Sequence, residues 1–599
     1  MGNLMNMVKM SIKPSRNGFD LSFKNNFTAK AGEFRPVMCK PVIPGDVWQC
    51  DLKSFTRLQP VNSAAYARMR EYYDFYFVPM ELLWNKFDTV ATQMKNNLQH
   101  ASGPVLSDNV APSGGIPYIT SQQIVGYLKA VKSKTNMFGY SRANMTCILL
   151  EYLGYGRFYD YLQDDVTWAS SPTCQNLKYT IMPLLAYQHI YADYCRYAQW
   201  ERTNPSTFNV DYIKGTDDLN VDIEATDFVK DYNFMDLRYC NYDKDLFFGV
   251  LPNAQYGEEA GVDMDVTSSG NLLFKDGSGA NLTGTDAYLT LGKLTSKNAL
   301  DAVSYVTQLS GLKANFSIIQ LRMAEATQRW KEVAQSVDED YKSQIEAQWG
   351  VKCSQFLSHQ SVYLGGISSS LDINPVVNSN LTGDNVADIQ GVGTIYNNGK
   401  IRFESGAQYG YIICLYHCVP VFDYQCDGVD AMTTDTDITD FPLPVFDRIG
   451  MQQLPSYLLS NPRKASDGSS DDYFISEFLK ANPYLGYVPR YAPWKTSIDV
   501  SRGAFVSTLR NWVIPFDKSL FVQTITNVIN NRIQNEGSDN SNVDTASFVT
   551  WSFFKCNPAV LDTLFAVNAD ATVDTDQFLI SCFIDIKVVR NLDVNGLPW

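Results

Sequence analysis

Alternation of apolar and polar residues marks four segments of this chain as β-strands: 47–55, 71–79, 410–421 and 576–590. Successive side chains of a strand point to opposite faces, so alternation is typical of a strand with one buried face. In the last segment the apolar face consists of Phe578, Ile580, Cys582, Ile584, Ile586 and Val588. Because these strands stand near both ends of the sequence, their pairing predicts an antiparallel sandwich with large insertions.

A second period, of three and four residues, predicts helices within these insertions. The clearest helix covers 318–349 and ends at Gly350. Its apolar positions are Ile319, Met323, Ala326, Trp330, Val333, Val337, Tyr341 and Ile345. Charged residues occupy much of the remaining surface, which makes the helix amphipathic. Further helices are expected at 80–96, 145–154 and 183–201.

The predicted domain organisation is an N-terminal arm, 1–45, followed by one β domain, 46–599. We expect a loop and helical insertion at 101–240 and loops at 376–400 and 460–475. Between 258 and 300 the chain is rich in Gly, Ser, Thr and Asn, and such a segment cannot bury much surface. A long loop of this kind is usually functional or disordered.

Composition adds two constraints. Aromatic residues make up 13 % of the chain, and they favour strands and large protein–protein contacts. The net charge of −15 argues against a chain that coats itself uniformly with nucleic acid, although a local basic face remains open. The clearest basic bias is N-terminal, at Lys9, Lys13, Arg16, Lys24 and Lys30, where we expect a solvated arm.

The twelve cysteines are too sparse for a disulfide scaffold, and they indicate free thiols in a reducing compartment. The start of the sequence has no apolar stretch typical of a secretion signal. The longest apolar run, 409–419, is far shorter than a membrane span. We therefore expect no secretion by the usual route and no membrane insertion.

The sequence predicts no catalytic, cofactor or metal site. Cys414, His417 and Cys418 suggest zinc, but on a strand His417 points away from the two thiols. Phosphate-loop, nucleophile-elbow and dinucleotide motifs are absent from the sequence. Cys240 has no histidine within ten residues, and its surroundings, 238–257, are interpreted as a structural turn followed by an apolar anchor. Tertiary structure could still bring a base near this thiol.

Eight stretches of the sequence form an ordered series. The first four are "FDLSFKNNFTAKAGEFRPVMCKPVIPGD" (19–46), "FTRLQPVNSAAYARMREYYDFYFVPMELLWNKF" (55–87), "LLAYQHIYADYCRYAQWE" (184–201) and "NYDKDLFFGVLPNAQYG" (241–257). The series continues with "IIQLRMAEATQRWKE" (318–332), "VYLGGISSSLDINPVV" (362–377), "NPYLGYVPRYAPWKTSIDVSRGAF" (482–505) and the stretch 576–599. In this order the stretches resemble the major capsid proteins of the Microviridae, the F-type capsid family, and in particular its gokushovirus-like members. The sequence departs from the family at "ESGAQYGYII" (404–413), where a Glu-His-Gly is expected.

The resemblance implies a mainly β fold, an eight-stranded antiparallel jelly roll with long, partly helical insertions. It implies a structural protein, not an enzyme, that self-assembles through pentameric intermediates into a T=1 icosahedral shell of sixty copies around circular single-stranded DNA. The expected location is the bacteriophage virion, assembled in the bacterial host cytoplasm. The alternative that we keep is an all-β enzyme acting on carbohydrate through paired carboxylates.

The resemblance also implies partners. An insertion is expected to form a surface protrusion that meets a host receptor, with 256–310 as the candidate and 101–140 as the second choice. A small basic DNA-binding protein and pilot or scaffolding proteins are expected beside the DNA. The candidate DNA-facing residues are Lys9, Lys13, Arg16, Lys24, Arg490, Tyr491 and Trp494.

Overall fold

The computed structural model divides the chain into two compact units, which are described separately. The main unit comprises Met1–Ala254, Asp338–Glu346 and Gly350–Trp599, and the second unit comprises Gln255–Val337 and Ala347–Trp349. The residues that the structure describes are 15–92, 115–162, 177–213, 219–221, 223, 233–261, 318–354, 359–377, 389–425, 428–438, 440–460, 483–536, 551–565 and 576–594, with six short strands between 265 and 315.

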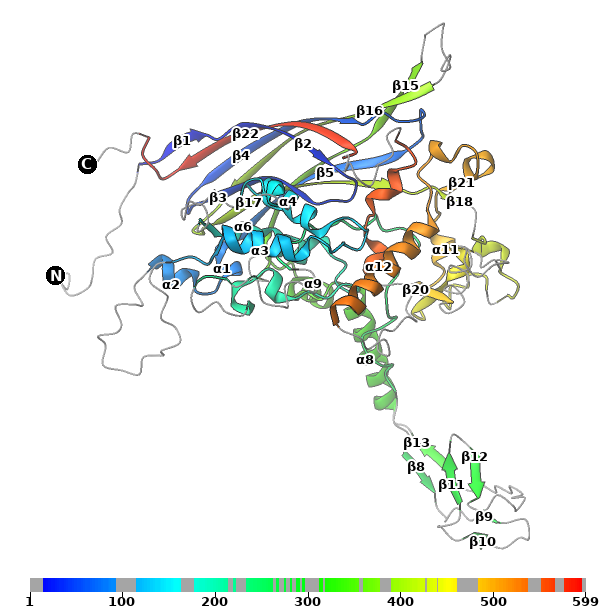
Figure 1. The fold of residues 1–599 in the computed structure, drawn as a ribbon. Helices are drawn as coiled ribbons and strands as arrows, with labels where there is room; N and C mark the ends of the chain where they lie inside the picture. The colour runs from blue at the N-terminus through cyan, green and yellow to red at the C-terminus, as the bar shows by residue number, and fades with distance from the viewer. Residues whose placement is uncertain are drawn as a thin grey trace, which may run out of the picture. The chain divides into compact units, whose positions relative to one another are not determined.

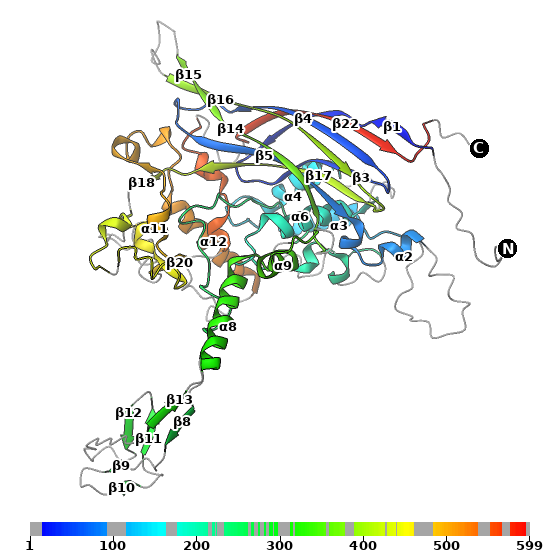
Figure 2. The same ribbon diagram turned by 180° about the vertical axis from the view of Figure 1, so that it is seen from behind.

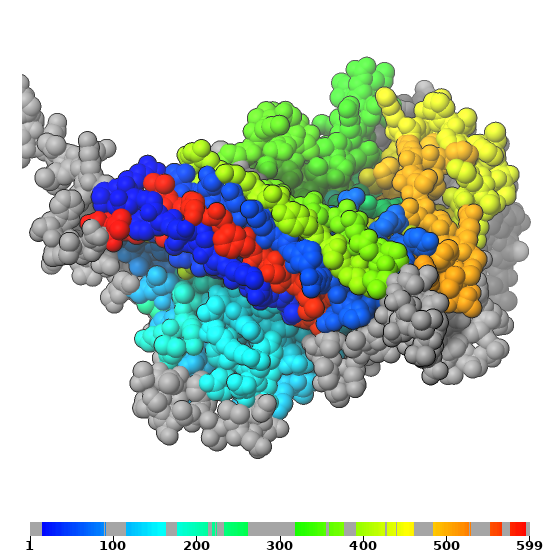
Figure 3. Space-filling model, turned by 90° about the horizontal axis from the view of Figure 1, so that it is seen from above, coloured from blue at the N-terminus to red at the C-terminus, as the bar shows by residue number. Residues whose placement is uncertain are grey.

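The first sheet of the main unit joins strands from the two ends of the sequence. Its order is β1-β22-β4-β16-β15, with β2 also paired to β22. The strands are β1 (Asn17–Asp20), β2 (Phe23–Ala29), β4 (Val47–Leu58), β15 (Asp372–Val377), β16 (Ile389–Glu404) and β22 (Phe578–Arg590). All these neighbours are antiparallel. Figure 3 shows β22, in red, between N-terminal strands in blue, which confirms the predicted non-local pairing.

The second sheet has the order β14-β5-β17-β3 and is also antiparallel. Its strands are β3 (Arg35–Val42), β5 (Arg68–Pro79), β14 (Val362–Ser370) and β17 (Gly410–Val421). Odd-numbered side chains of β5 point to the first sheet: the rings of Phe77 and Phe403 on β16 are 4.7 Å apart. Even-numbered side chains of β5 therefore point to the opposite face.

Helices cover that opposite face of the second sheet (Figures 1 and 2). They are α3 (Ser121–Val131), α4 (Arg142–Tyr152) and α6 (Met182–Ile190). Helix α6 contacts β5 and β17, and α4 contacts β3. Leu184, Leu185 and Ala186 of α6 are fully buried, because this helix is apolar on nearly all sides. The main unit is thus three layers, two of strand and one of helix.

Smaller elements complete both units. The main unit also contains α1 (Met80–Leu83), α2 (Phe87–Thr92), β6 (Tyr118–Thr120), β7 (Lys178–Thr180), β18 (Tyr424–Gln425), β19 (Met451–Pro455), β20 (Tyr484–Pro489), α11 (Ala492–Lys495), β21 (Val500–Ser501) and α12 (Lys518–Glu536). In the second unit β8 (Asp265–Ser268) pairs with β13 (Leu312–Asn315), β9 (Phe274–Lys275) with β10 (Asn281–Leu282), and β11 (Ala287–Thr290) with β12 (Lys293–Ser296).

The prediction of an N-terminal arm over 1–45 is wrong for its described part. Strands β1, β2 and β3 lie within it, and β2 pairs along β22 from Phe23 to Ala29. Phe27 and Ala29 are buried, whereas Lys24 and Asn26, which precede them in the strand, are exposed. The segment alternates like the other strands, but its several lysines resemble a solvated arm in composition.

The loop predicted at 376–400 is also corrected, because β15 extends to Val377 and 389–400 belongs to β16. Burial alternates along β16, yet the buried positions include Gly391, Gly393 and Asn397 where large apolar residues would be expected. A side chain at Gly393 would collide with Leu58. Because these buried positions hold small or polar residues, the sequence lacks the apolar alternation that would have predicted this strand.

The single helix predicted at 318–349 is two helices, α8 (Ile318–Ser336) and α9 (Tyr341–Trp349). The Asp340 side chain accepts a hydrogen bond from the Ser343 backbone N–H at 2.9 Å and so starts a new helix. The expected single domain from 46 onward divides into the two units given above. Part of the predicted insertion 101–240, the second-choice protrusion residues 101–114, and most of the loop 460–475 lie outside the described residues.

Candidate functional site

A cleft of about 490 Å³ lies on the face of the second sheet that the helices cover. Strand β5 contributes Tyr72, Asp74 and Tyr76, and β17 contributes His417. The other walls come from β14, from the turn after α6 and from the stretch 240–244. We call this feature the tyrosine cleft, because Tyr194, Tyr197, Tyr242 and Tyr363 also line it.

The tyrosine cleft shows whether tertiary structure brings a base near the Cys240 thiol. Tertiary structure does bring a histidine to it, since Cys240 and His417 line the same cleft. His417 is a poor general base, because burial lowers its pKa to about 3. The ring of His417 stacks on Tyr72 with centroids 4.9 Å apart. Burial also raises the pKa of the neighbouring thiol of Cys195 well above its usual value, so this thiol is unreactive.

The strand geometry expected at 414–418 is confirmed, since these residues belong to β17. Cys414 lies near Cys582 and Cys50 between the sheets, whereas His417 packs against Phe34 on the opposite face. Within the described ranges, groups of three His, Cys, Asp or Glu side chains that could hold a metal ion do not occur.

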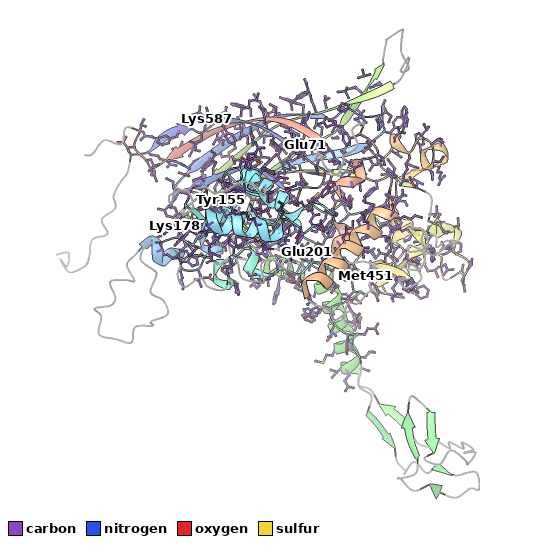
Figure 4. The ribbon with its side chains drawn as sticks, in the orientation of Figure 1. Glu71, Tyr155, Lys178, Glu201, Met451 and Lys587 are labelled. Atoms are coloured by element: carbon purple, nitrogen blue, oxygen red, sulfur yellow. The ribbon has the colours of Figure 1, made fainter. Side chains whose placement is uncertain are left out.

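A buried carboxylate ties the two sheets together. Glu71 on β5 accepts hydrogen bonds from Thr56 Oγ1 on β4 at 2.6 Å and from Asn397 Nδ2 on β16 at 2.7 Å. Figure 4 shows Glu71 among the strand layers. Burial raises the pKa of Glu71 to about 7, although these hydrogen bonds oppose the shift.

This carboxyl group predicts a pH-dependent stability. The folded chain holds the Glu71 proton up to about pH 7, whereas the unfolded chain releases it near 4.5. The folded state therefore binds more protons between these values, and the free energy of unfolding falls as pH rises through this window, by roughly 3 kcal/mol. Urea unfolding from pH 4.5 to 8 should show a slope that is reduced in Glu71→Gln. An equal slope in both proteins would contradict this assignment.

The sequence-predicted DNA-facing residues do not come together in one place. Lys9 and Lys13 lie outside the described residues. Arg16 and Lys24 are exposed at β1 and β2, and Arg490, Tyr491 and Trp494 lie where β20 meets α11. Figures 1 and 2 place β1 and α11 on opposite sides of the main unit.

The group at α11 is only partly open. Tyr491 is 5 % exposed, so its ring has no free face for a base, whereas Trp494 is 40 % exposed. The Arg490 guanidinium lies 5.1 Å from the centre of the Tyr491 ring. At the N-terminal side Lys30 is buried, and its ammonium lies 4.2 Å from the centre of the Tyr140 ring. Stacking by Tyr491 therefore gains no support from this conformation, and Lys30 does not belong to a solvated arm.

Sequence reasoning missed an exposed apolar segment at 432–449. Its exposed apolar side chains are Met432, Ile438, Phe441, Leu443, Val445, Phe446 and Ile449. Phe441 also contacts Trp494, with ring centroids 6.1 Å apart. Soluble monomers rarely expose so many large apolar residues in one segment, and such surfaces mark protein contacts. The signal was visible as "DFPLPVF" (440–446), an apolar run that two prolines keep from forming a central strand.

The apolar face of α8 is likewise exposed. Met323 and Trp330 are 68 % and 51 % exposed, and Gln335 is the buried residue of this helix. The periodicity predicted the helix correctly, but it did not reveal that the apolar face stays open in the chain. Among the described residues, none of the helices is both long and apolar enough to cross a membrane.

Comparison with known proteins identifies the family. A family model described as "Capsid protein (F protein)" matches residues 7–147 and 156–457. "Capsid protein VP1" of Chlamydia phage 1 is 22 % identical over 567 residues, covering 83 % of this chain and 86 % of that protein. "Capsid protein VP1" of Bdellovibrio phage phiMH2K is 22 % identical over 525 residues, covering 83 % and 84 %. These matches give no support to the carbohydrate-active alternative. The chain belongs to the phage capsid protein (F protein) family and is a structural major capsid protein of the Microviridae type.

Proposed function

We propose that this capsid protein is an eight-stranded jelly roll that forms a T=1 icosahedral shell of sixty copies around circular single-stranded DNA. The observation that carries the proposal is the family match over most of the chain. Assembly into a multi-copy capsid follows from that family. The copy number, the pentameric intermediates and the enclosed DNA are the parts that we propose.

Strand order supports the jelly roll. Strands β1 and β2 follow one another along β22, and β15 pairs with the first part of β16, so each sheet has a central set of four strands. These are β2, β3, β4, β5, β14, β16, β17 and β22 in chain order. Numbered one to eight, they read 1-8-3-6 in one sheet and 2-7-4-5 in the other, as in a jelly roll with its Greek-key crossings.

Exposed apolar surface supports self-assembly. A shell requires each copy to offer several heterologous contacts that close into rings. The segment 432–449 offers apolar side chains without a β-strand edge, which suits a specific contact more than uncontrolled sheet extension. We assign this segment to a contact between copies in the shell.

Substitution of Val445 tests the assembly surface. Val445 is 82 % exposed, so Val445→Asp should change the free energy of unfolding of the unassembled chain by less than about 0.5 kcal/mol. The same change should lower the yield of closed particles at least tenfold, because a buried contact would then hold an unpaired charge. Sedimentation and electron microscopy measure the yield, and Val445→Ile, which keeps the apolar surface, is the matched control. Normal particle yield from Val445→Asp would remove this segment from the contact.

DNA contact is proposed for Lys9, Lys13, Arg16, Lys24, Arg490 and Trp494, with Tyr491 requiring a change of conformation to take part. With a net charge of −15 the chain itself supplies little neutralisation, and a small basic protein would supply the rest. Nuclease protection of DNA in purified particles tests enclosure. Particles that form but leave their DNA fully digestible would contradict this part while leaving assembly intact.

The host-facing role is proposed for the insertion 256–310, which falls within the second unit. Its composition and its separation as a unit support a projecting element between β5 and β14. Pilot or scaffolding proteins and a host receptor complete the proposed partners. The proposed location is the virion, with assembly in the bacterial cytoplasm.

A further inference from the structure

The floor of the tyrosine cleft carries a carboxylate that lacks a cationic partner among the described side chains. Asp74 accepts a hydrogen bond from the Tyr363 hydroxyl at 3.1 Å. Nδ1 of His417 lies 3.9 Å from Asp74 Oδ2, but His417 is neutral at neutral pH because burial lowers its pKa to about 3. Burial raises the pKa of Asp74 itself to about 6. A desolvated carboxylate of this kind gains most from a positively charged ligand.

Another polar atom of the same cleft is an acceptor without a partner. Asn241 Nδ2 donates to the Cys195 carbonyl oxygen at 2.8 Å, which fixes the side-chain amide, and its Oδ1 has no hydrogen-bond partner within the described part of the chain. His417 Nδ1 is also buried without a hydrogen-bond partner among the described residues. A ligand that matches Asn241 Oδ1 and the Asp74 carboxylate must bring hydrogen-bond donors.

The Asp74 carboxylate is accessible from the β14 side of the cleft because residue 366 is glycine. A Cβ atom at Gly366 would collide with Asp74 Oδ1 and with the Tyr363 hydroxyl. Any other residue at this position would displace the Asp74 carboxylate or cover it. The absence of a side chain thus leaves the acidic floor accessible.

The walls present aromatic rings suited to a cation. Tyr76 lies 5.2 Å from Tyr194 and 5.3 Å from Tyr363 between ring centroids, and the latter two rings are 6.3 Å apart. Aromatic faces attract ammonium and guanidinium groups by their quadrupole. The same cleft already shows one such contact, since the Lys244 ammonium lies 4.9 Å from the centre of the Tyr197 ring.

We propose that the tyrosine cleft is a binding site for an alkylammonium or guanidinium group, with Asp74 as its counter-charge and Tyr194 and Tyr363 as its aromatic wall. The ligand is a basic side chain of a polypeptide or a free aliphatic amine, which share this chemistry. Either one donates hydrogen bonds to the Asp74 carboxylate and replaces the missing cation. The site is independent of how many copies form the shell.

Calorimetric titration of the full-length unassembled chain tests the site. The probes are N-acetyl-lysine methylamide, N-acetyl-arginine methylamide and putrescine, and the uncharged control is N-acetyl-norleucine methylamide. We expect the cations to bind with a Kd in the millimolar range and Asp74→Asn to weaken them at least tenfold. The matched control is Asp372→Asn, which removes an exposed carboxylate outside the cleft and changes the net charge equally. Tighter binding by the lysine or arginine derivative would indicate a polypeptide source, and tighter binding by putrescine would indicate a free amine.

Two variants of Tyr363 separate the contribution of its aromatic ring from that of its hydrogen bond to Asp74. Tyr363→Phe keeps the ring and should retain cation binding, whereas Tyr363→Ala should weaken it several-fold. The Tyr363 pair gives the answer even if Asp74→Asn does not fold. Equal binding of the norleucine derivative, or an affinity that is the same in Asp74→Asn and Asp372→Asn, would overturn the proposal.

Discussion

Replacement of Phe248 by alanine is expected to lower the free energy of unfolding of the main unit by about 4 kcal/mol. Phe248 is 1 % exposed, and its ring packs against Tyr242, Phe422 and Phe553 with centroids 4.9, 5.8 and 5.1 Å away. Alanine would remove the ring from a cluster that draws on distant parts of the sequence and leave a cavity that rigid neighbours cannot fill. The shift of the urea unfolding midpoint measures the loss.

The matched control for Phe248→Ala is Tyr212→Ala. Tyr212 is exposed, so its truncation should change stability by less than about 0.5 kcal/mol. Phe248→Leu should recover part of the loss because it refills part of the cavity. A loss below 1 kcal/mol in Phe248→Ala would show that the stretch 238–257 is not the structural anchor that its sequence indicates.

Substitution of Arg35 by methionine should cost about 4 kcal/mol, again as a loss of unfolding free energy. Arg35 begins β3 and is almost fully buried, with Nε donating to Glu33 Oε2 at 2.7 Å and Nη1 to Asp576 Oδ2 at 3.1 Å. Burial alone would lower the pKa of Arg35, but the two carboxylates outweigh it and raise the pKa well above its usual value. Methionine roughly keeps the volume of the side chain but removes the guanidinium that is ion-paired with the buried Glu33 at 2.6 Å.

A double variant separates the lost charge from the lost packing. Arg35→Met combined with Glu33→Gln should be more stable than Arg35→Met alone, because the uncompensated buried charge is then gone. Arg402→Met, at an exposed pair with Glu404, should have little effect on stability. If Arg402→Met and Arg35→Met cost the same, the buried network does not stabilise the fold.

The strands with large apolar faces could be predicted from the sequence. Ile580, Ile584 and Ile586 are buried on one face of β22, as their alternation indicated, because β-branched residues at every second position fit a half-buried sheet. The turn predicted at 243–245 lies slightly later in the chain, at 246–249. Asp245 accepts the backbone N–H groups of Phe247 and Phe248 at 2.9 and 2.8 Å and so begins the apolar anchor.

The tyrosine cleft could not be predicted, because its residues meet only through tertiary structure. Asp74, Cys240 and His417 are separated by more than a hundred residues at each step, and each looks ordinary in its own segment. Strand β16 could not be predicted for a different reason. Gly391 and Asn397 occupy buried positions where neighbouring side chains supply the bulk or a hydrogen bond, so local hydrophobicity carried no signal.

The position of β22 has a consequence for how the chain is made. Strand β22 lies between β2 and β4, although more than five hundred residues separate β2 from it along the sequence. A growing polypeptide that has not yet passed residue 578 leaves facing edges of β2 and β4 unpaired, and such edges invite wrong partners. Closure of the first sheet is therefore a late step of synthesis, dominated by long-range contacts and slow. Only a complete subunit can therefore form the first sheet, since an unfinished chain lacks the strand that pairs with both β2 and β4.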